Sequence, residues 1–445
     1  MSKYDQFIKD VGPQKFNRGG MLWMGFLILL IVAGVVAYID QLIEGQVVTN
    51  MRDYVLWGVY ISNFVFFVAT SFVGAIVVAV LRLTKSEWRR PFVRLAEIVA
   101  LACIIMAGIT IVIDMARPDR MLNLFIHARL QSPITWDVII IPTFIVVSLL
   151  LLYFPLIPDF AILRDHYKGN NKRLSKIYGF FAVKWQWTKE QLKLQKKSVH
   201  LLALMIIPLG LILESIDAYL FSTTYRVGWD SSNFAPYFIS GAMVAGIGAL
   251  VSVVYIVRRN KQLESYITEY HFDKMGKLFN LACIIYLYFN INEYLVPLFT
   301  AKKGESEHLE TLLRGDFAIP FWIVTLIGLV LPAILLIFKR FRKPRPMFYI
   351  AVVVVICSWW KRYLIVTPTL LHPYLPIQGV PESWRHYFPS LHEWVITSAT
   401  LAMALLIITL LVRYVPVMSI DRLAEDEAER VSAAERVSTE KKATV

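Results

Sequence analysis

The stretch D-M-A-R-P-D-R-M-L-N-L-F-I-H-A-R-L-Q-S-P-I-T-W-D, residues 114–137, is a short polar connection between two strongly apolar runs. The runs occupy residues 94–113 and 138–154. An α-helix rises about 1.5 Å per residue, so each run is long enough to cross a hydrocarbon core of about 30 Å. The sequence therefore predicts that one transmembrane helix ends at Asp114 and that the next begins at Asp137.

Apolar runs of this kind recur along the whole chain of 445 residues, of which 57% are hydrophobic. Such a composition is typical of a polytopic membrane protein. The first run lacks a small-residue cleavage site, so we expect a retained helix and not a signal peptide. The predicted fold is all-α, with about ten transmembrane helices at residues 21–41, 55–81, 95–114, 137–157, 199–220, 234–257, 276–299, 317–338, 347–371 and 394–416.

An even number of spans places both termini on one side of the membrane, called side A here, and the opposite side is side B. Roughly three quarters of the 46 Lys and Arg residues fall in the loops and tails of side A, which predicts that side A is cytoplasmic. We therefore expect a bacterial or archaeal cytoplasmic (inner) membrane as the location. The net charge of +13 follows from this topology, so no nucleic-acid partner is expected.

An internal repeat divides the chain. L-A-C-I-I occurs at residues 101–105 and again at 281–285, and at nearly the same offset residues 58–62 resemble 236–240. The repeat indicates two parallel four-helix bundles flanked by two extra helices. The predicted divisions are residues 1–54 (cytoplasmic N-tail and helix 1), 55–220 (first bundle), 221–371 (second bundle), 372–416 (periplasmic loop and helix 10) and 417–445 (charged cytoplasmic tail).

Three segments outside this pattern carry their own predictions. The small residues of 69–75 and 240–249 would allow close helix contacts. Aromatic residues mixed with lysines at 177–193 favour a helix lying in the membrane interface, with an ordinary solvated helix as the alternative. The charged tail after Tyr414 is expected to be a solvent-exposed helix or disordered.

Cysteine and histidine usage argues against a redox cofactor in this chain. None of the three cysteines has a partner at C-x-x-C spacing, so neither an iron–sulfur cluster nor a zinc site is expected. The eight histidines lie in loops or at helix ends, whereas a membrane haem would need facing histidines inside helices. We therefore expect no haem, no iron–sulfur cluster and no metal.

Ionisable residues within the predicted spans gather near side B, and the half of the membrane next to side A holds little beyond Glu97. Such residues are costly in a bilayer, and interfacial anchors or structural ion pairs would be spread over both interfaces. A buried site near side B fits this distribution better. Buried carboxylates with neighbouring cations exchange protons near neutral pH. A lipid-soluble ligand that exchanges protons when its redox state changes, namely a quinone, suits such a site.

Five motifs stand out along the chain: W-G-V-Y-I-S-N-F-V-F (57–66), S-P-I-T-W-D (132–137), P-L-I-P-D-F-A-I-L-R-D (155–165), H-F-D-K-M-G-K (271–277) and K-R-Y-L-I-V-T-P-T-L (361–370). Together they resemble the NrfD/polysulfide-reductase family, most closely its ten-helix, HybB-like branch, which includes the membrane subunits of alternative complex III. The resemblance covers roughly residues 50–416. It implies a menaquinol or other quinone site near the periplasmic face and a periplasmic iron–sulfur partner subunit, often with a molybdopterin-type subunit, or with a haem-c subunit in alternative complex III, beside other membrane subunits.

One motif departs from the pattern of alternative complex III. A histidine is expected there in a sequence like I-H-L-G-R, but this chain reads I-D-M-A-R, with Asp114 in its place. Asp137 matches the aspartate of the family's W-D motif, and the resemblance implies that it accepts protons. Pro133 disfavours a helical backbone conformation at Ser132, so the helix should start close after Ser132. The alternative role for Asp137 is a helix cap.

The sequence thus predicts an oxidoreductase subunit of a respiratory or photosynthetic complex, active only within that complex. The subunit would exchange electrons between a quinone and an iron–sulfur partner. A variant of this hypothesis couples the electron transfer to proton translocation. A secondary transporter, which needs charges at the membrane midplane, and a passive anchor, which needs no buried ionisable groups, are the alternatives. The candidate residues are Asp137 and Asp114 for catalysis; Arg117, His127, Tyr60, Asn63, Glu214, Asp217, Glu293 and Arg362 for quinone binding; and Glu97, Ser71 and Thr70 for a proton path to side A.

Overall fold

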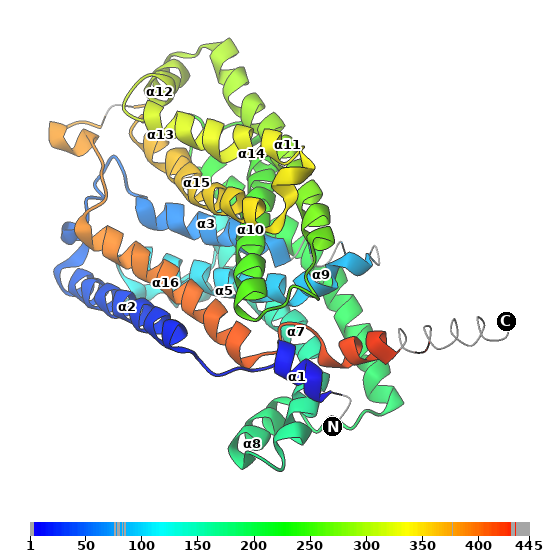
Figure 1. Cartoon of the computed structure of the whole chain (residues 1–445). Coiled ribbons are helices and arrows are strands. Elements are labelled where there is room, and N and C mark those ends of the chain that lie inside the picture. The colour runs from blue at the N-terminus through cyan, green and yellow to red at the C-terminus, as the bar shows by residue number, and fades with distance from the viewer. Residues whose placement is uncertain are drawn as a thin grey trace.

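The computed structural model describes residues 4–74, 77, 81, 83, 86–375, 377–428 and 432, and within these residues it contains helices and no strand (Figure 1). The described part of the chain has nine helices long and apolar enough to span a membrane, together with the shorter apolar helix α3. The long helices are α2 (Arg18–Glu44), α5 (Arg90–Asp114), α7 (Pro133–Tyr167), α9 (Lys189–Ser222), α10 (Phe234–Asn260), α11 (Glu269–Thr300), the continuous run α13, η5 and α14 (Ala318–Trp322, Ile323–Val330, Leu331–Leu335), α15 (Pro344–Leu370) and α16 (Leu391–Tyr414).

The all-α, polytopic prediction is therefore confirmed. Helix α3 (Val59–Val73) falls at the second predicted span, and part of that span, within residues 74–85, lies outside the described residues. Shorter helices complete the fold: α1 (Asp5–Val11), η1 (Gly45–Val48), η3 (Glu87–Arg89), η4 (Pro118–Arg120), α6 (Asn123–Ile126), α8 (Lys172–Phe181), α12 (Lys303–Leu313), η6 (Lys339–Arg342) and η7 (Glu382–Arg385).

The spanning helices pack as one connected bundle, within which the two predicted groups of helices make the following contacts. In the first group α3 contacts α5, α5 contacts α7, and α7 contacts α9, which closes back on α3. In the second group α10 contacts α11 and α15, and the π-helical stretch η5 packs on α15. The groups meet along α3 and α10, where a Cβ on Gly246 would lie 2.7 Å from Cβ of Val73. The predicted close contacts of small residues are thus present, while the duplication itself stays a prediction.

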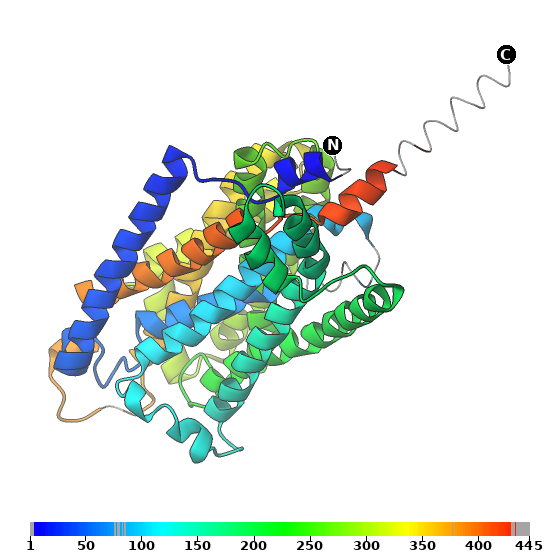
Figure 2. The ribbon, with the colours of Figure 1, turned by 90° about the horizontal axis from the view of Figure 1, so that it is seen from below.

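The first and last spanning helices form a separate pair. Helices α2 and α16 pack side by side along the outside of α3 and α5 (Figures 1 and 2). Gly34 of α2 lies directly against Ala399 of α16, so that any larger side chain would clash. The outer face of α2 exposes a run of large apolar side chains, as expected of a helix that faces lipid.

Helix α1 and the segment that follows α16 lie at the same end of the molecule as α8, and α12 lies at the opposite end (Figure 1). Helix α1 also contacts that segment directly, because the backbone N–H of Val417 donates to the carbonyl of Val11 at 3.1 Å. The first and last described segments of the chain therefore lie on the same side of the bundle, the predicted side A.

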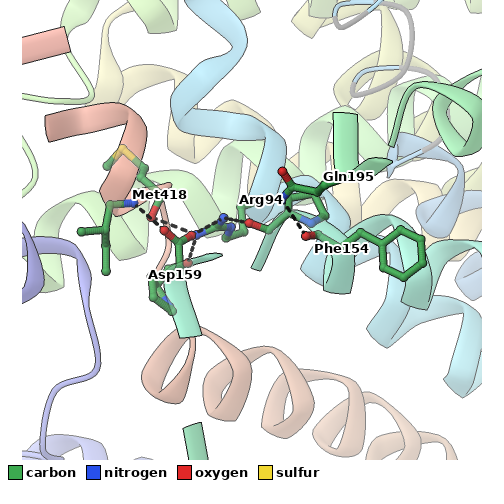
Figure 3. Close-up of polar contacts among 8 residues, drawn as sticks. Arg94, Phe154, Asp159, Gln195 and Met418 are labelled. Carbon is green, nitrogen blue, oxygen red and sulfur yellow. Dashed lines mark hydrogen bonds and ion pairs between the residues drawn. The ribbon is translucent and has the colours of Figure 1, made fainter. Parts of the chain in front are cut away.

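A buried ion pair fastens the C-terminal segment to the bundle on side A (Figure 3). Arg94 of α5 and Asp159 of α7 lie 2.7 Å apart. The Arg94 guanidinium also donates to the carbonyls of Pro416 and Met418, both at 2.9 Å, and the Asp159 carboxylate accepts from the N–H of Ile420 at 2.9 Å. Both charged groups thus bind the backbone that follows α16.

This contact corrects the expectation that the whole tail after Tyr414 is solvent-exposed or disordered. Val417 and Ile420 are fully buried, and a further helix covers residues 420–428. The apolar side chains of this short segment pack on the bundle, and the backbone polar groups are satisfied by Arg94 and Asp159. Most of the tail beyond residue 428 lies outside the described residues.

The predicted interfacial helix at 177–193 is also wrong as a single element. Helix α8 ends at Phe181, and α9 already begins at Lys189. Val183, Lys184 and Trp187 between them have positive φ angles, so the chain turns sharply where the sequence suggested a continuous helix.

Candidate functional site

Helix α9 brings two carboxylates to one face near side B. Glu214 and Asp217 are three residues apart, which places both side chains on the same face of the helix. Both residues are fully buried, and none of their four carboxylate oxygens has a hydrogen-bond partner in the described protein. Buried polar groups are almost always hydrogen-bonded, so this pair is exceptional.

A third carboxylate and a guanidinium complete the cluster. Asp137 of α7 and Arg362 of α15 both lie within electrostatic range of Asp217, and Arg362 is also in range of Glu214. The guanidinium lies 4.7 Å from the ring centre of Phe238, and its Nη1 has no hydrogen-bond partner in the described protein. We call Asp137, Glu214, Asp217 and Arg362 the buried cluster.

Charges buried without partners are expensive, so water, a ligand or protons must complete this cluster when it functions. Gly241 lets Tyr286 and Arg362 pack closely against α10, since a Cβ there would lie 3.0 Å from the Tyr286 ring and 3.3 Å from Arg362 Nη2. The three carboxylates outnumber the one guanidinium. The cluster is therefore suited to binding protons.

The start of α7 decides between the two roles considered for Asp137. The helix begins at Pro133, with Ser132 as the N-cap residue, so Asp137 lies in the second turn. Its side chain is 4% exposed, and Oδ1 has no hydrogen-bond partner in the described protein. Because the helix starts four residues earlier than predicted, the cap alternative is wrong, whereas the proton-accepting role stays a prediction.

A second polar group surrounds Asp114 at the end of α5. The Asp114 carboxylate is in electrostatic range of Glu393, and Oδ1 has no hydrogen-bond partner in the described protein. Tyr60 is in range of both carboxylates and donates its hydroxyl to Gln41 Oε1 at 2.8 Å. The ring of Tyr60 and the carboxylate of Asp114 therefore belong to one site between α2, α3, α5 and α16.

Glu393 differs from Asp114 in being fully satisfied. It accepts hydrogen bonds from the Tyr387 hydroxyl and from the N–H groups of Asn50 and Ser390, and it forms a capping box with Ser390 at the start of α16. This arrangement holds the helix end and the loop after η1 together. Asp114 is thus the carboxylate of this group with unused hydrogen-bonding capacity.

The remaining predicted residues fall in several places. Asn63 donates to Thr400 Oγ1 at 2.7 Å and accepts from Trp359 Nε1 at 3.1 Å. Arg117 and His127 are exposed in the loop between α5 and α7, where Arg117 pairs with Asp119 at 2.9 Å. The structure thus brings neither of these two basic residues into the buried cluster.

Glu293 lies apart from the buried cluster, beside a cavity described below. Glu97, Ser71 and Thr70 are all buried, and the hydroxyls of Ser71 and Thr70 donate to carbonyls of their own helix, those of Val68 and Phe66. These bonds are common for such residues in helices, so the path to side A stays a prediction.

Sequence reasoning missed several partners. Gln41 and Thr400 hydrogen-bond to Tyr60 and Asn63, respectively, and each pair joins two helices. The polar residues themselves were visible in apolar runs, but Asn63 and Thr400 are 337 positions apart, so only the fold could pair them.

Comparison with known proteins gives a family and several relatives. The family model "Polysulphide reductase, NrfD" matches residues 47–373. A putative membrane subunit of dimethyl sulfoxide reductase from Halobacterium salinarum is 28% identical over 353 residues, covering 77% of this chain and 75% of that protein.

Two further relatives span more of the chain. The integral membrane subunit of menaquinone reductase from Nitratidesulfovibrio vulgaris is 24% identical, covering 89% of this chain and 91% of that protein. A selenate reductase subunit of Mesobacillus selenatarsenatis is 22% identical, covering 89% of this chain and 94% of that protein. Since the family model spans well over half of the chain, the chain belongs to the polysulphide reductase, NrfD family of integral membrane proteins.

Proposed function

We propose that this protein is the quinone-binding membrane subunit of a reductase-type electron-transfer complex, and that the quinone reacts near side B. The observation that supports the proposal best is the buried cluster, in which three carboxylates and a guanidinium lie in an apolar interior with unsatisfied hydrogen-bonding groups. The names of the relatives point the same way, since each is a subunit of a reductase and one is a menaquinone reductase.

The chemistry follows from the charges. A quinol that is oxidised loses protons and electrons together, so its site needs a nearby base and a route for electrons. Asp137 is the proposed base, with Asp114 as a second acceptor at the neighbouring helix end. Glu214 and Asp217 take up the proton next, and Arg362 stabilises whichever carboxylate is ionised. In quinone reduction the same groups act in reverse.

The electrons require a partner. We propose that they pass to or from an iron–sulfur subunit bound on side B, which the positive-inside pattern predicts to be the periplasmic side. Tyr60, Asn63, Arg117 and His127 are the proposed contacts to the quinone head group and its approach. A passive anchor would not need a buried cluster that lacks partners, and a transporter would place it at the midplane.

The test is Asp137→Asn in membranes that contain the assembled complex. Asn keeps the shape of the side chain and removes the proton acceptor. Quinol turnover should fall by about 10²-fold, the low end of what a positioned acid or base contributes, while the complex assembles normally. The matched control is Asp53→Asn, which changes an exposed carboxylate on side B and should leave turnover unchanged. Near-normal turnover of an intact Asp137→Asn complex would remove Asp137 from the chemistry.

A further inference from the structure

A small cavity lies on side B of the second helix group, apart from the buried cluster. It is lined by the loop before α10 and by residues of α10, α11, α12 and α15. It offers ≈ 30 Å³ to the centre of a water-sized sphere. One water needs roughly 10–15 Å³ by this measure, so the cavity has room for about two waters and not for a quinone head group.

The cavity wall is unusually rich in groups that bind protons. It includes the carboxylates of Glu293 and Glu305, the phenols of Tyr237 and Tyr294, and the imidazole of His308. The Tyr237 hydroxyl and His308 Nδ1 have no hydrogen-bond partner in the described protein, although these side chains are only 1% and 6% exposed. A cavity with such unsatisfied groups holds ordered water, whereas an apolar one stays dry.

Polar residues connect the inner end of the cavity to Arg362 of the buried cluster. Lys361 is 3% exposed, donates from Nζ to the Tyr294 hydroxyl at 2.9 Å and is in electrostatic range of Glu293. The next residue along α15 is Arg362, a member of the buried cluster. Tyr286, whose ring stacks on Tyr237 at 5.4 Å, is also in range of Arg362. Polar groups therefore continue from the cavity to the cluster.

The outer end reaches the surface of side B. Glu305, near the start of α12, accepts a hydrogen bond from the Thr300 hydroxyl at 2.8 Å and pairs with Lys302 at 3.3 Å. The Lys302 side chain is 67% exposed. Glu305 itself is only 6% exposed, so its carboxylate lies just beneath the surface, between the exposed Lys302 and the cavity.

We propose that this cavity holds a short file of water molecules that carries protons between Glu305, beside the exposed Lys302 on side B, and the carboxylates of the buried cluster. Each step passes a proton along a hydrogen bond between a water and a carboxylate, phenol or imidazole, and no electron moves. The inference rests on the proposed function only for the source of the protons. It assigns Glu293 to proton relay in place of the quinone contact predicted from the sequence.

The first test concerns the water itself and needs no turnover. A structure of the complex at a resolution that shows ordered waters should place them within hydrogen-bond distance of the Tyr237 hydroxyl and His308 Nδ1. A dry cavity in such a structure would overturn the proposal, whatever the activity of Asp137→Asn. The proposed water file and the proposed quinone site are therefore tested by independent experiments.

The second test uses two variants of different kinds. Glu293→Gln removes the relay carboxylate but keeps an oxygen for the bonds from Ser231 and Asn233. Leu309→Phe fills part of the cavity and changes no titratable group. Both should slow quinol turnover, the first by about 10²-fold, and increase its solvent deuterium isotope effect, because proton transfer becomes rate-limiting. The KM for quinol should not change.

The matched control lies on the same helix as Glu305. Glu307→Gln changes an exposed carboxylate of α12 that does not line the cavity, and it should leave turnover and the isotope effect as in the unmodified complex. Added formate, a small weak acid that delivers protons, should partly restore turnover in Glu293→Gln, which it would not do for a folding defect. Unchanged turnover and isotope effect in both variants would overturn the proposal.

Discussion

The two ends of the membrane-spanning region treat buried charge in opposite ways. On side A, Arg94 and Asp159 form an ion pair at 2.7 Å, and both groups also bind backbone groups of the C-terminal segment. On side B, Glu214 and Asp217 are equally buried, but their oxygens have no hydrogen-bond partners in the described protein.

This difference separates structure from function. A buried charge that is paired with an opposite charge in the folded chain holds elements in place, and removing its partner weakens the fold. A buried charge without partners weakens the fold while it waits for a proton or a ligand, so it persists only where it is used. Variants of the side-A pair should therefore lower stability more than activity, and variants of the side-B carboxylates should lower activity more than stability.

The largest expected effect is on side A. Arg94→Met should lower the free energy of unfolding by about 3–5 kcal/mol, because it leaves the Asp159 carboxylate buried and unpaired. The purified protein should melt at a lower temperature in detergent, and a protease should cut the segment 415–420 faster. Any quinol turnover that survives in folded material should have the normal KM.

Arg90→Met is the matched control, since Arg90 pairs with Asp426 at the surface, where the two side chains are 45% and 36% exposed. An exposed pair contributes about 0–1 kcal/mol, so melting should change little. If both variants melted alike, burial would not be the property that distinguishes the side-A pair.

The reverse result is expected from Glu214→Gln and Asp217→Asn on side B. Each replaces a buried carboxylate by a neutral amide of the same shape, so melting should stay the same or rise. Quinol turnover should nevertheless fall by about 10²-fold, since a group that takes up the proton is lost. Melting curves and turnover of the same preparations give the answer, and a loss of stability without a loss of turnover would make this pair structural.

A feature of this molecule can be predicted from the sequence when the residues that produce it lie close together along the chain. The spanning helices, the shared side of the termini and the crowding of charges near side B follow from hydropathy and composition, which are local. Arg94 and Asp159 were missed because their partners lie beyond α16, and because the predicted fourth span ended before Asp159 whereas α7 continues to Tyr167.

Two details of the site show the same limit. Glu305 and His308 lie on α12, which is too short and too polar to stand out from a loop in the sequence. Their importance appears only when the fold places them against α11 and α15. Asp137 was predicted from a motif, but its role as a possible cap depended on where α7 begins, and a proline at N1 shifts that start by one turn.

The smallest expected effect comes from Arg117→Ala. Arg117 is exposed on side B and its bond is to Asp119, so its loss should change stability by about 0–1 kcal/mol. If the exposed guanidinium attracts the quinol or guides its approach, the KM for quinol should rise while kcat stays the same, which is the pattern of lost binding without lost chemistry. The increase in KM should shrink at high salt, because an exposed charge is screened within roughly 10 Å at 0.1 M ionic strength.

Arg117→Lys keeps the charge and should behave nearly as the unmodified protein. A fall in kcat as large as that of Asp137→Asn would place Arg117 with the buried cluster, and exposure would then no longer mark which side-B charges take part in the reaction.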